Sequence, residues 1–313
     1  MDAPTGLRNP NSLFFYFQAL FLGIRMMQTG TPAIAFKNLT RDFPIGLRGY
    51  KLRALESVDM EIPAEGIFGL LGPNGSGKST SIKIILGLLK ASAGTCEVFG
   101  KPAGSLEARN RIGYLPENPH FHKFLTGREL VKYFAGLSGM EPKAIPERTD
   151  SVIEQVGMGH GANRKIGTYS KGMQQRIGLA QALVHDPDIL VLDEPLSGLD
   201  PQGTREVMDL LKDLRAQGKA VLICSHLLTR IEEICDRVAI LYKGRLIKEG
   251  SMDELLGGYG ESHVLTVSGG RAAREKAGEA LSGVGLKLED AQTSRRPLDD
   301  WFLELIKGKE GEA

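Results

Sequence analysis

GIFGLLGPNGSGKST, residues 66–80, is the stretch that decides the fold. Its opening GIFGLL is an apolar run of the kind that forms a strand buried on both faces of a parallel sheet. The following GPNGSGKS matches G-x-x-x-x-G-K-[ST] in full, a pattern whose glycine-rich loop wraps a phosphate. The next residues, SIKIILGLLK, predict a helix. A buried strand, a glycine-rich loop and a helix in this order predict a nucleotide-binding site.

The chemistry of phosphate binding explains each residue type in this loop. Gly75 and Gly77 lack side chains, so the backbone can take positive φ and turn its N–H groups toward an anion. Lys78 supplies positive charge to the β- and γ-phosphates, and the hydroxyl of Ser79 suits Mg²⁺. Thr80 offers the next N–H and hydroxyl to the α-phosphate. The predicted nucleotide-binding residues of the loop are Gly72, Pro73, Asn74, Gly75, Ser76, Gly77, Lys78, Ser79 and Thr80.

A pair of acids follows a second buried strand, in the run DILVLDEP. Ligands of open α/β sheets bind at the carboxyl ends of strands, so Asp193 and Glu194 are expected at the edge that carries the glycine-rich loop. We expect Asp193 to hold Mg²⁺ through water, and Glu194 to orient and deprotonate an attacking water. A third strand, AVLICS, ends at His226, which can hydrogen-bond a γ-phosphate. The turn SGLD, after the acids, could place Asp200 near the same site.

The order of these segments resembles the ATP-binding subunit of ABC transporters. The segments are GPNGSGKST, YSKGMQQRIGLAQAL, ILVLDEP, SGLD and the final SH, within residues 34–257. The segment YSKGMQQR stands where that family carries its LSGGQ signature, which caps the nucleotide of a second subunit in a head-to-tail dimer. The resemblance therefore implies that Ser170 and Gly172 contact ATP bound to the partner. A hydroxyl and a helix N-terminus suit that role.

Three positions, in two segments, depart from the family pattern. In the signature, Lys171 replaces a Gly and Met173 replaces a Gln. In the run IGYLPEN, Glu117 stands in place of the Gln of the family's Q-loop. A carboxylate can still bind Mg²⁺ or its water, but it cannot donate a hydrogen bond. The YLPE variant is similar to ABC-2-type export ATPases, and we keep Glu117 as a candidate catalytic and metal-binding residue.

An aromatic side chain that stacks on adenine is expected before the glycine-rich loop. Phe43 is the first choice, and Tyr50 is the alternative, because FPIGLRGYKLRA contains an apparent insertion. The basic residues Arg48, Lys51 and Arg53 are expected simply to be solvated. The pair His120 and His122 has no third ligand in view, so we do not expect it to bind a metal.

The predicted fold class is α/β. The resemblance implies a P-loop NTPase, with a RecA-like mixed sheet, an antiparallel β subdomain and a helical subdomain. Its ATP-binding domain would span residues 33–257, with the helical subdomain at about 104–186, facing a membrane permease. Residues 262–313 read as a small C-terminal α+β domain with two strands and two helices.

Residues 1–30 form an extension of a different character. The apolar run LFFYFQALFLGI is shorter than the roughly 18 residues of a membrane-spanning helix. One interpretation is that the first 25 residues are not native and that translation starts at Met26 or Met27. The alternatives are a helix that lies on a membrane or a partner, and an arm that packs on the core.

Composition supports a globular chain and excludes several classes. Among 313 residues, 42% are hydrophobic and 25% charged, the net charge is +1, and the three cysteines are scattered. These values exclude a disordered chain and a disulfide scaffold, and they give no reason to expect a nucleic-acid partner.

The resemblance implies an ATP- and Mg²⁺-dependent ATPase subunit that pairs with a second ATP-binding subunit. It would drive a separate transmembrane permease for export, at the cytoplasmic face of the cell membrane. The alternative is a non-transport ABC ATPase that acts on DNA, ribosomes or chromosomes. Those relatives usually carry two nucleotide domains, coiled coils or zinc modules, and none of these is visible in the sequence.

Overall fold

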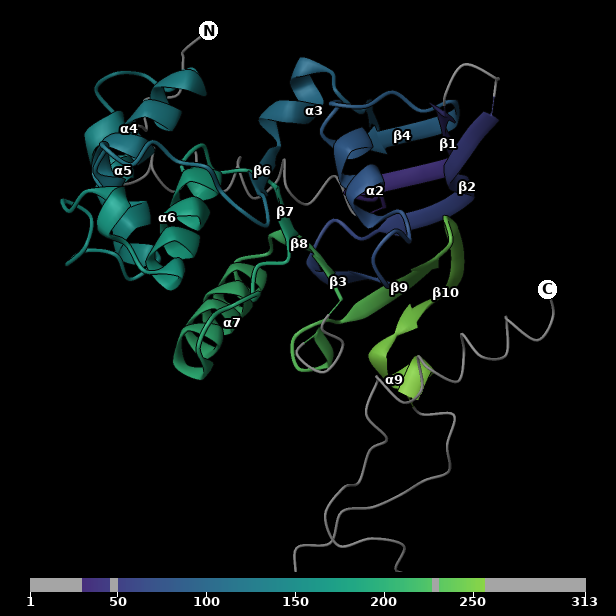
Figure 1. Ribbon diagram of the computed structural model, residues 1–313. Coiled ribbons are helices and arrows are strands. Elements are labelled where there is room, and N and C mark those ends of the chain that lie inside the picture. Colours follow the sequence, from purple (N-terminus) through teal and green to yellow (C-terminus); the bar gives the residue numbers. More distant parts are fainter. Residues whose placement is uncertain (1–29, 46–49, 227–230, 257–313) are drawn as a thin grey trace, which may run out of the picture.

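A computed structural model describes residues 30–45, 50–226 and 231–256, and the structural statements below concern these residues. Two β-sheets and a group of helices make up the fold (Figure 1). The strands are β1 (Ile34–Ile45), β2 (Tyr50–Ile62), β3 (Gly66–Leu71), β4 (Ala93–Val98), β5 (Lys101–Pro102), β6 (Ile112–Leu115), β7 (Ile189–Asp193), β8 (Ala220–Ser225), β9 (Arg237–Tyr242) and β10 (Arg245–Ser251). The helices are α2 (Lys78–Ile85), α3 (Leu106–Asn110), α4 (Gly127–Leu137), α5 (Ile145–Gln155), α6 (Lys171–Leu183), α7 (Pro201–Ala216) and α9 (Met252–Leu256), with a 3₁₀ turn, η1 (Ile166–Thr168).

The larger sheet has six strands in the order β10-β9-β3-β8-β7-β6. The strands from β9 to β6 are parallel, and β10 pairs antiparallel with β9. The apolar runs in β3, β7 and β8 fit this position, since both faces of the sheet are covered. In β3, Ile67 and Leu71 pack into a core shared with the helices. The alternating Phe68 and Leu70 pack into a second core on the opposite face.

The smaller sheet has four strands in the order β2-β1-β4-β5, and its pairs are antiparallel. Its inner face, with Ile34, Phe36 and Leu39, packs into the second core. The long hairpin β1–β2 continues beyond this core, and its register sets Phe43 opposite Leu52. The predicted mixed α/β fold with an antiparallel β part is therefore confirmed.

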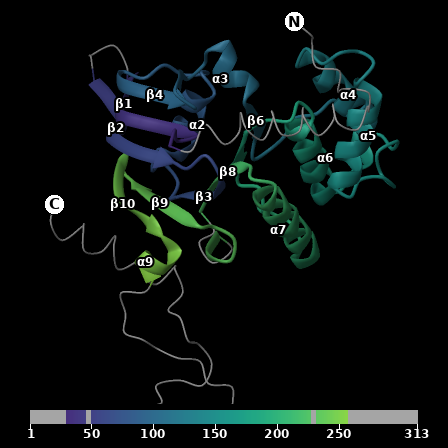
Figure 2. The ribbon, with the colours of Figure 1, turned by 180° about the vertical axis from the view of Figure 1, so that it is seen from behind.

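Helices α4, α5 and α6 gather at one end of the molecule, and β1, β2 and β4 lie at the other (Figures 1 and 2). A capping box begins α4, because the Thr126 side chain accepts from the Glu129 N–H and Glu129 bonds back to Thr126. Strand β6 lies directly against α6, since a Cβ on Gly113 would come within 2.3 Å of the Ala182 carbonyl oxygen. The predicted range 104–186 thus includes β6, a strand of the main sheet.

Helix α2 is shorter than the sequence suggested. We expected it to run through SIKIILGLLK, but it ends at Ile85. Gly87 then takes a φ of 70°, and a Cβ there would lie 2.2 Å from Cα of Gly104. The N–H groups of Gly87 and Leu88 donate to the carbonyl oxygens of Ile84 and Lys83, so Gly87 ends the helix as a glycine C-cap, a local signal that the sequence analysis missed.

The remaining predictions about organisation lie largely outside the described residues. These are the extension at 1–30, apart from Gly30, and the small α+β domain at 262–313. The other domain boundaries stay predictions. Within the described residues, no helix combines the length and apolar character that crossing a bilayer requires.

Candidate active site

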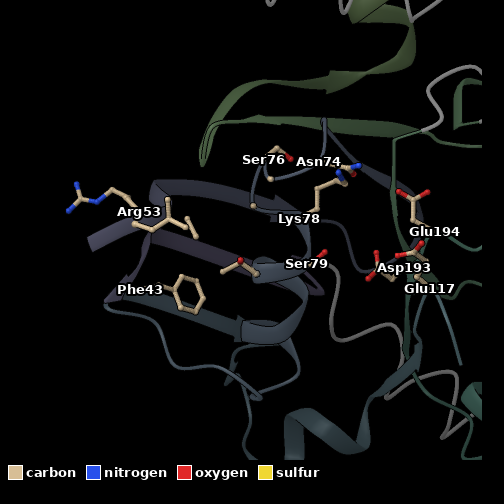
Figure 3. A pocket seen from close by; sticks show the side chains of 14 residues that line it. Phe43, Arg53, Asn74, Ser76, Lys78, Ser79, Glu117, Asp193 and Glu194 are labelled. Atoms are coloured by element: carbon tan, nitrogen blue, oxygen red, sulfur yellow. The ribbon is translucent and has the colours of Figure 1, made fainter. Parts of the chain in front are cut away.

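The glycine-rich loop forms one wall of a cavity of about 280 Å³, and the acids after β7 form another (Figure 3). The two come together because β3, β8 and β7 are parallel neighbours and end at the same edge. The cavity is lined by Phe43, Leu52, Arg53, Ala54, Asn74, Gly75, Ser76, Gly77, Lys78, Ser79, Thr80, Glu117, Asp193 and Glu194. Gly72 and Pro73 do not line it, but their carbonyl oxygens accept hydrogen bonds from Lys78.

Two glycines fix the shape of the loop. Gly72 has φ 154°, and a Cβ on it would lie 2.2 Å from the Leu241 carbonyl oxygen. Gly77 precedes α2 with φ 114°, and a Cβ there would lie 2.7 Å from a methyl group of Leu55. Both positions require glycine for backbone conformation and for space. Gly75, with φ 79°, has open space where a Cβ would be, so only its conformation requires glycine.

Lys78 is buried at the start of α2 and reaches back across the loop. Its Nζ donates to the carbonyl oxygens of Gly72 (2.5 Å) and Pro73 (3.2 Å). These bonds use two of its three donors, so one is left for a phosphate oxygen. Burial lowers the pKa of Lys78, and the negative charges of Glu194 and Asp193 oppose that change. The ammonium is thus positioned before any ligand arrives.

Asp193 is partly buried at the end of β7, across the cavity from Ser79 (Figure 3). The pKa of Asp193 is raised from 3.8 to about 6; desolvation is the largest cause, and the neighbouring Glu194 and Glu117 act in the same direction against the effect of Lys78. Three carboxylates around one cavity repel each other, and a cation would relieve this repulsion.

Glu194 is held by three hydrogen bonds. Ser225 Oγ donates to its Oε2 (3.0 Å), and the backbone N–H of His226 donates to its Oε1 (2.9 Å). The ring Nδ1 of His226 lies 2.7 Å from the same Oε1. The backbone of Glu194 has φ 49°, a left-handed conformation that is rare outside glycine and typical of functional positions. The carboxylate is therefore fixed in place, and a ring with Nδ1 so engaged has Nε2 left for a phosphate.

Phe43 stands on the hairpin at the side of the cavity opposite the acids (Figure 3). The guanidinium of Arg41 covers one face of its ring, 4.6 Å from the ring centre. Tyr50, the alternative choice, is 69% exposed and does not line the cavity. The hairpin also brings Arg53 to the cavity, with its Nε 2.9 Å from Asp42 Oδ1. From the sequence we expected Arg53 only to be solvated. Its place at the cavity depends on the register between β1 and β2, which the sequence pattern does not reveal.

The signature residues lie apart from this cavity. Ser170 is exposed and caps α6, because its Oγ accepts from the Met173 N–H at 3.3 Å. Asp200 caps α7 in the same way, accepting from Gly203 at 2.7 Å. Neither these caps nor Gly172 line the cavity. In a single copy, Ser170 and Asp200 are thus seen as helix caps, and their contact with a nucleotide stays a prediction for a dimer.

The expected magnesium ligands share the cavity wall. Ser79, Asp193 and Glu117 supply only oxygen atoms, which Mg²⁺ prefers. Among the described residues, no group of three or more His, Cys, Asp and Glu side chains forms a metal cage. Mg²⁺ usually binds one or two protein oxygens together with substrate phosphates. His120 and His122, on the loop after Glu117, belong to no such group either.

These observations define the class of protein domain to which the site belongs. A glycine-rich loop between β3 and α2, with an acid pair at the end of β7, makes this a P-loop NTPase domain. The family model for the ABC transporter matches residues 55–197. An uncharacterized ABC transporter ATP-binding protein from Synechocystis sp. is 40% identical over 75% of this chain and 66% of its own length. The Nod factor export ATP-binding protein I from Burkholderia lata is 38% identical over 71% of this chain and 72% of its own length.

The chain belongs to the ATP-binding proteins of ABC transporters, and its domain is an ATPase domain of that family. It spans slightly less than two thirds of the length of several curated relatives, between 64% and 66%. Among solved structures, a dimeric ATP-binding cassette in a post-hydrolysis state with ADP and Pi has a TM-score of 0.64 and 27% identity. The match covers 70% of this chain and 98% of that one. The predicted family and fold are confirmed.

Proposed function

We propose that this chain is the ATP-hydrolysing subunit of an ABC transporter. It pairs head to tail with a second copy and drives a separate membrane permease, for export, from the cytoplasmic face. One observation carries the proposal. A single cavity is lined by the aromatic ring of Phe43, by the glycine-rich loop with Lys78, and by the acids Asp193 and Glu194. These are the parts that binding a base, holding its phosphates and activating a water require.

The geometry divides the work among the residues. Phe43 offers a ring face for the base, and the loop N–H groups with Lys78 hold the phosphates. Glu194 orients the attacking water and accepts its proton, and its hydrogen bonds to Ser225 and His226 keep the carboxylate in position. His226 contacts the γ-phosphate through Nε2.

Magnesium completes the proposed site. Ser79 and Asp193 would hold the ion, with Glu117 as a further ligand or a ligand of its water. Bound there, Mg²⁺ would neutralise negative charge on the phosphates. The raised pKa of Asp193 supports this assignment, because repulsion among the carboxylates favours a cation between them.

The partners and direction rest on relatives. One relative is named a Nod factor export protein, and one similar cassette is described as dimeric with ADP and Pi. Another, from Clostridium perfringens, is described as part of an ABC transporter complex, with a TM-score of 0.64 and 26% identity over 82% of this chain and 98% of that one. These names support a dimer, a membrane partner and export for this chain.

Two variants test the proposal. Glu194→Gln keeps the size of the side chain but removes the base, so ATP hydrolysis should fall by about 10²- to 10⁴-fold while ATP binding persists. Lys78→Ala should abolish ATP binding or turnover. Glu233→Gln, a change of the same chemistry at a position outside the cavity, is the matched control and should leave the rate unchanged. Hydrolysis by Lys78→Ala at the wild-type rate would reject the phosphate-loop assignment.

A further inference from the structure

The aromatic ring that faces the nucleotide cavity carries a cation on its other side. Arg41 and Phe43 are two residues apart on β1, the spacing that sets side chains on one face of a strand. The guanidinium carbon of Arg41 lies 4.6 Å from the centre of the Phe43 ring. Phe43 lines the nucleotide cavity and Arg41 does not, so the guanidinium covers the face of the ring that is turned away from the cavity.

The surroundings of Arg41 hold its guanidinium against the ring. Arg41 Nη1 donates to the carbonyl oxygen of Lys90 at 2.9 Å, in the segment between α2 and β4. Arg41 Nε is buried and has no hydrogen-bond partner among the described residues, so this edge of the guanidinium is not in water. The neighbouring acid, Asp42, accepts from Arg53. The electron-rich face of the Phe43 ring is the surface that the cation meets.

A second neighbour lies at the side of the ring. Leu52 is directly opposite Phe43 in the register of the hairpin, and it also lines the cavity. Side chains that are directly opposite in an antiparallel pair are neighbours on one face of the sheet. With Leu52 beside it and Arg41 over one face, the ring has its cavity face left for a base (Figure 3).

We propose that Arg41 is a positioning residue for the nucleotide: its guanidinium fixes the Phe43 ring from behind, and the base binds on the opposite face. A base that binds to a loose ring must also immobilise it, and a ring that is held beforehand avoids this cost. The cation also draws the ring electrons toward its own side, which reduces repulsion between the ring and the electron-rich face of the base. The inference rests on the proposed function, because it takes Phe43 as the residue that stacks on the base.

The first test measures the binding of ADP with Mg²⁺ by titration calorimetry, since ADP carries the same base and is not hydrolysed. Arg41→Met keeps the length of the side chain without its charge and should weaken ADP binding by about two- to tenfold. In a Phe43→Ala background the same change should have no effect, because Arg41 acts only through the ring. Lys51→Met removes an exposed charge from the same hairpin, outside the cavity, and should have no effect in either background. A loss of the same size in both backgrounds, or none in either, would overturn the proposal.

A second variant keeps the proposal testable if Arg41→Met does not fold. Arg41→Lys retains the positive charge but lacks the flat guanidinium that covers the ring. It should weaken ADP binding by about twofold, and again only when Phe43 is present. The same loss in the Phe43→Ala background would show that Arg41 does not act through the ring.

The second test needs no nucleotide. With 4-fluorophenylalanine placed at position 43 alone, fluorine NMR reports the surroundings of this ring. Arg41→Met should shift the fluorine resonance, because a cation over the ring face changes its electron density, and Lys51→Met should leave the resonance in place. A resonance that Arg41→Met does not move would overturn the contact on which the proposal depends.

The two tests separate this inference from the proposed function. If the protein failed to bind ADP, or if Phe43→Ala left ADP binding unchanged, the proposed stacking on Phe43 would fail and this inference with it. The fluorine spectrum would still show whether Arg41 covers the ring. Weaker ADP binding by Phe43→Ala, together with no effect of Arg41→Met, would contradict the positioning role alone.

Discussion

Asp193→Asn should stabilise the protein in the absence of nucleotide and divalent cations. Burial and the neighbouring carboxylates raise the pKa of Asp193 from 3.8 to about 6, so the folded state holds this carboxylate ionised at a cost. The unfavourable contribution is fully present above the folded pKa of about 6. It is lost as the pH falls from there toward 3.8, where the unfolded chain also takes up the proton.

The size of the effect follows from this pKa. For a fully buried carboxyl group, a pKa shift of this size corresponds to a loss of about 3 kcal/mol in the free energy of unfolding. Asp193 is only partly buried, and solvent screening reduces the value to about 1–2 kcal/mol. For a domain of this size, that is a rise in Tm of about 2–8 °C. Near pH 5 the gain should be about half of its value at pH 7.5.

Calorimetry with EDTA at the two pH values measures this gain. Asp209→Asn, at an exposed position on α7, is the control and should leave Tm almost unchanged. The same Asp193→Asn protein should lose Mg²⁺-dependent ATP hydrolysis, because one oxygen ligand is replaced by an amide. A lower Tm for Asp193→Asn than for wild type at pH 7.5, or a gain in Tm that grows as the pH falls, would show that the ionised Asp193 carboxylate does not destabilise the fold.

Further predictions concern the glycine-rich loop, the stacking of an aromatic ring on adenine, and the N-cap of α7. Gly72→Ala should lower the free energy of unfolding, measured with denaturant, by about 3 kcal/mol, because backbone strain at positive φ adds to a clash of the new Cβ with the Leu241 carbonyl oxygen. Gly75→Ala, with open space, should cost about 1 kcal/mol. Phe43→Ala should weaken ATP binding by about 1–3 kcal/mol in titration calorimetry, and Tyr50→Ala should leave it unchanged. Asp200→Ala should cost about 1 kcal/mol of stability through its lost cap; an unchanged stability would show that the cap contributes nothing.

Local patterns predicted much of the fold. The apolar runs at β3, β7 and β8 indicated buried parallel strands, and the structure has them. Because parallel strands end at one edge, the expected meeting of Lys78 with Asp193 followed from the sequence. The catalytic and binding roles of these residues stay predictions.

Features that depend on long-range contacts were not predictable. The hairpin register brings Arg53 to the cavity, and Gly87 lies close against the backbone of Gly104. Ser225 was predicted only as a strand residue, yet it holds Glu194 in place. No sequence period encodes such contacts, since each joins segments that are distant along the chain.

The central claim is that this chain binds ATP as a head-to-tail dimer and hydrolyses it with Glu194. Light scattering of Glu194→Gln with and without MgATP tests this most directly. We expect a monomer without nucleotide, a mass twice as large with MgATP, and a return to the monomer with MgADP. A mass that stays monomeric while ATP is demonstrably bound, or hydrolysis of ATP by this variant at the wild-type rate, would contradict it.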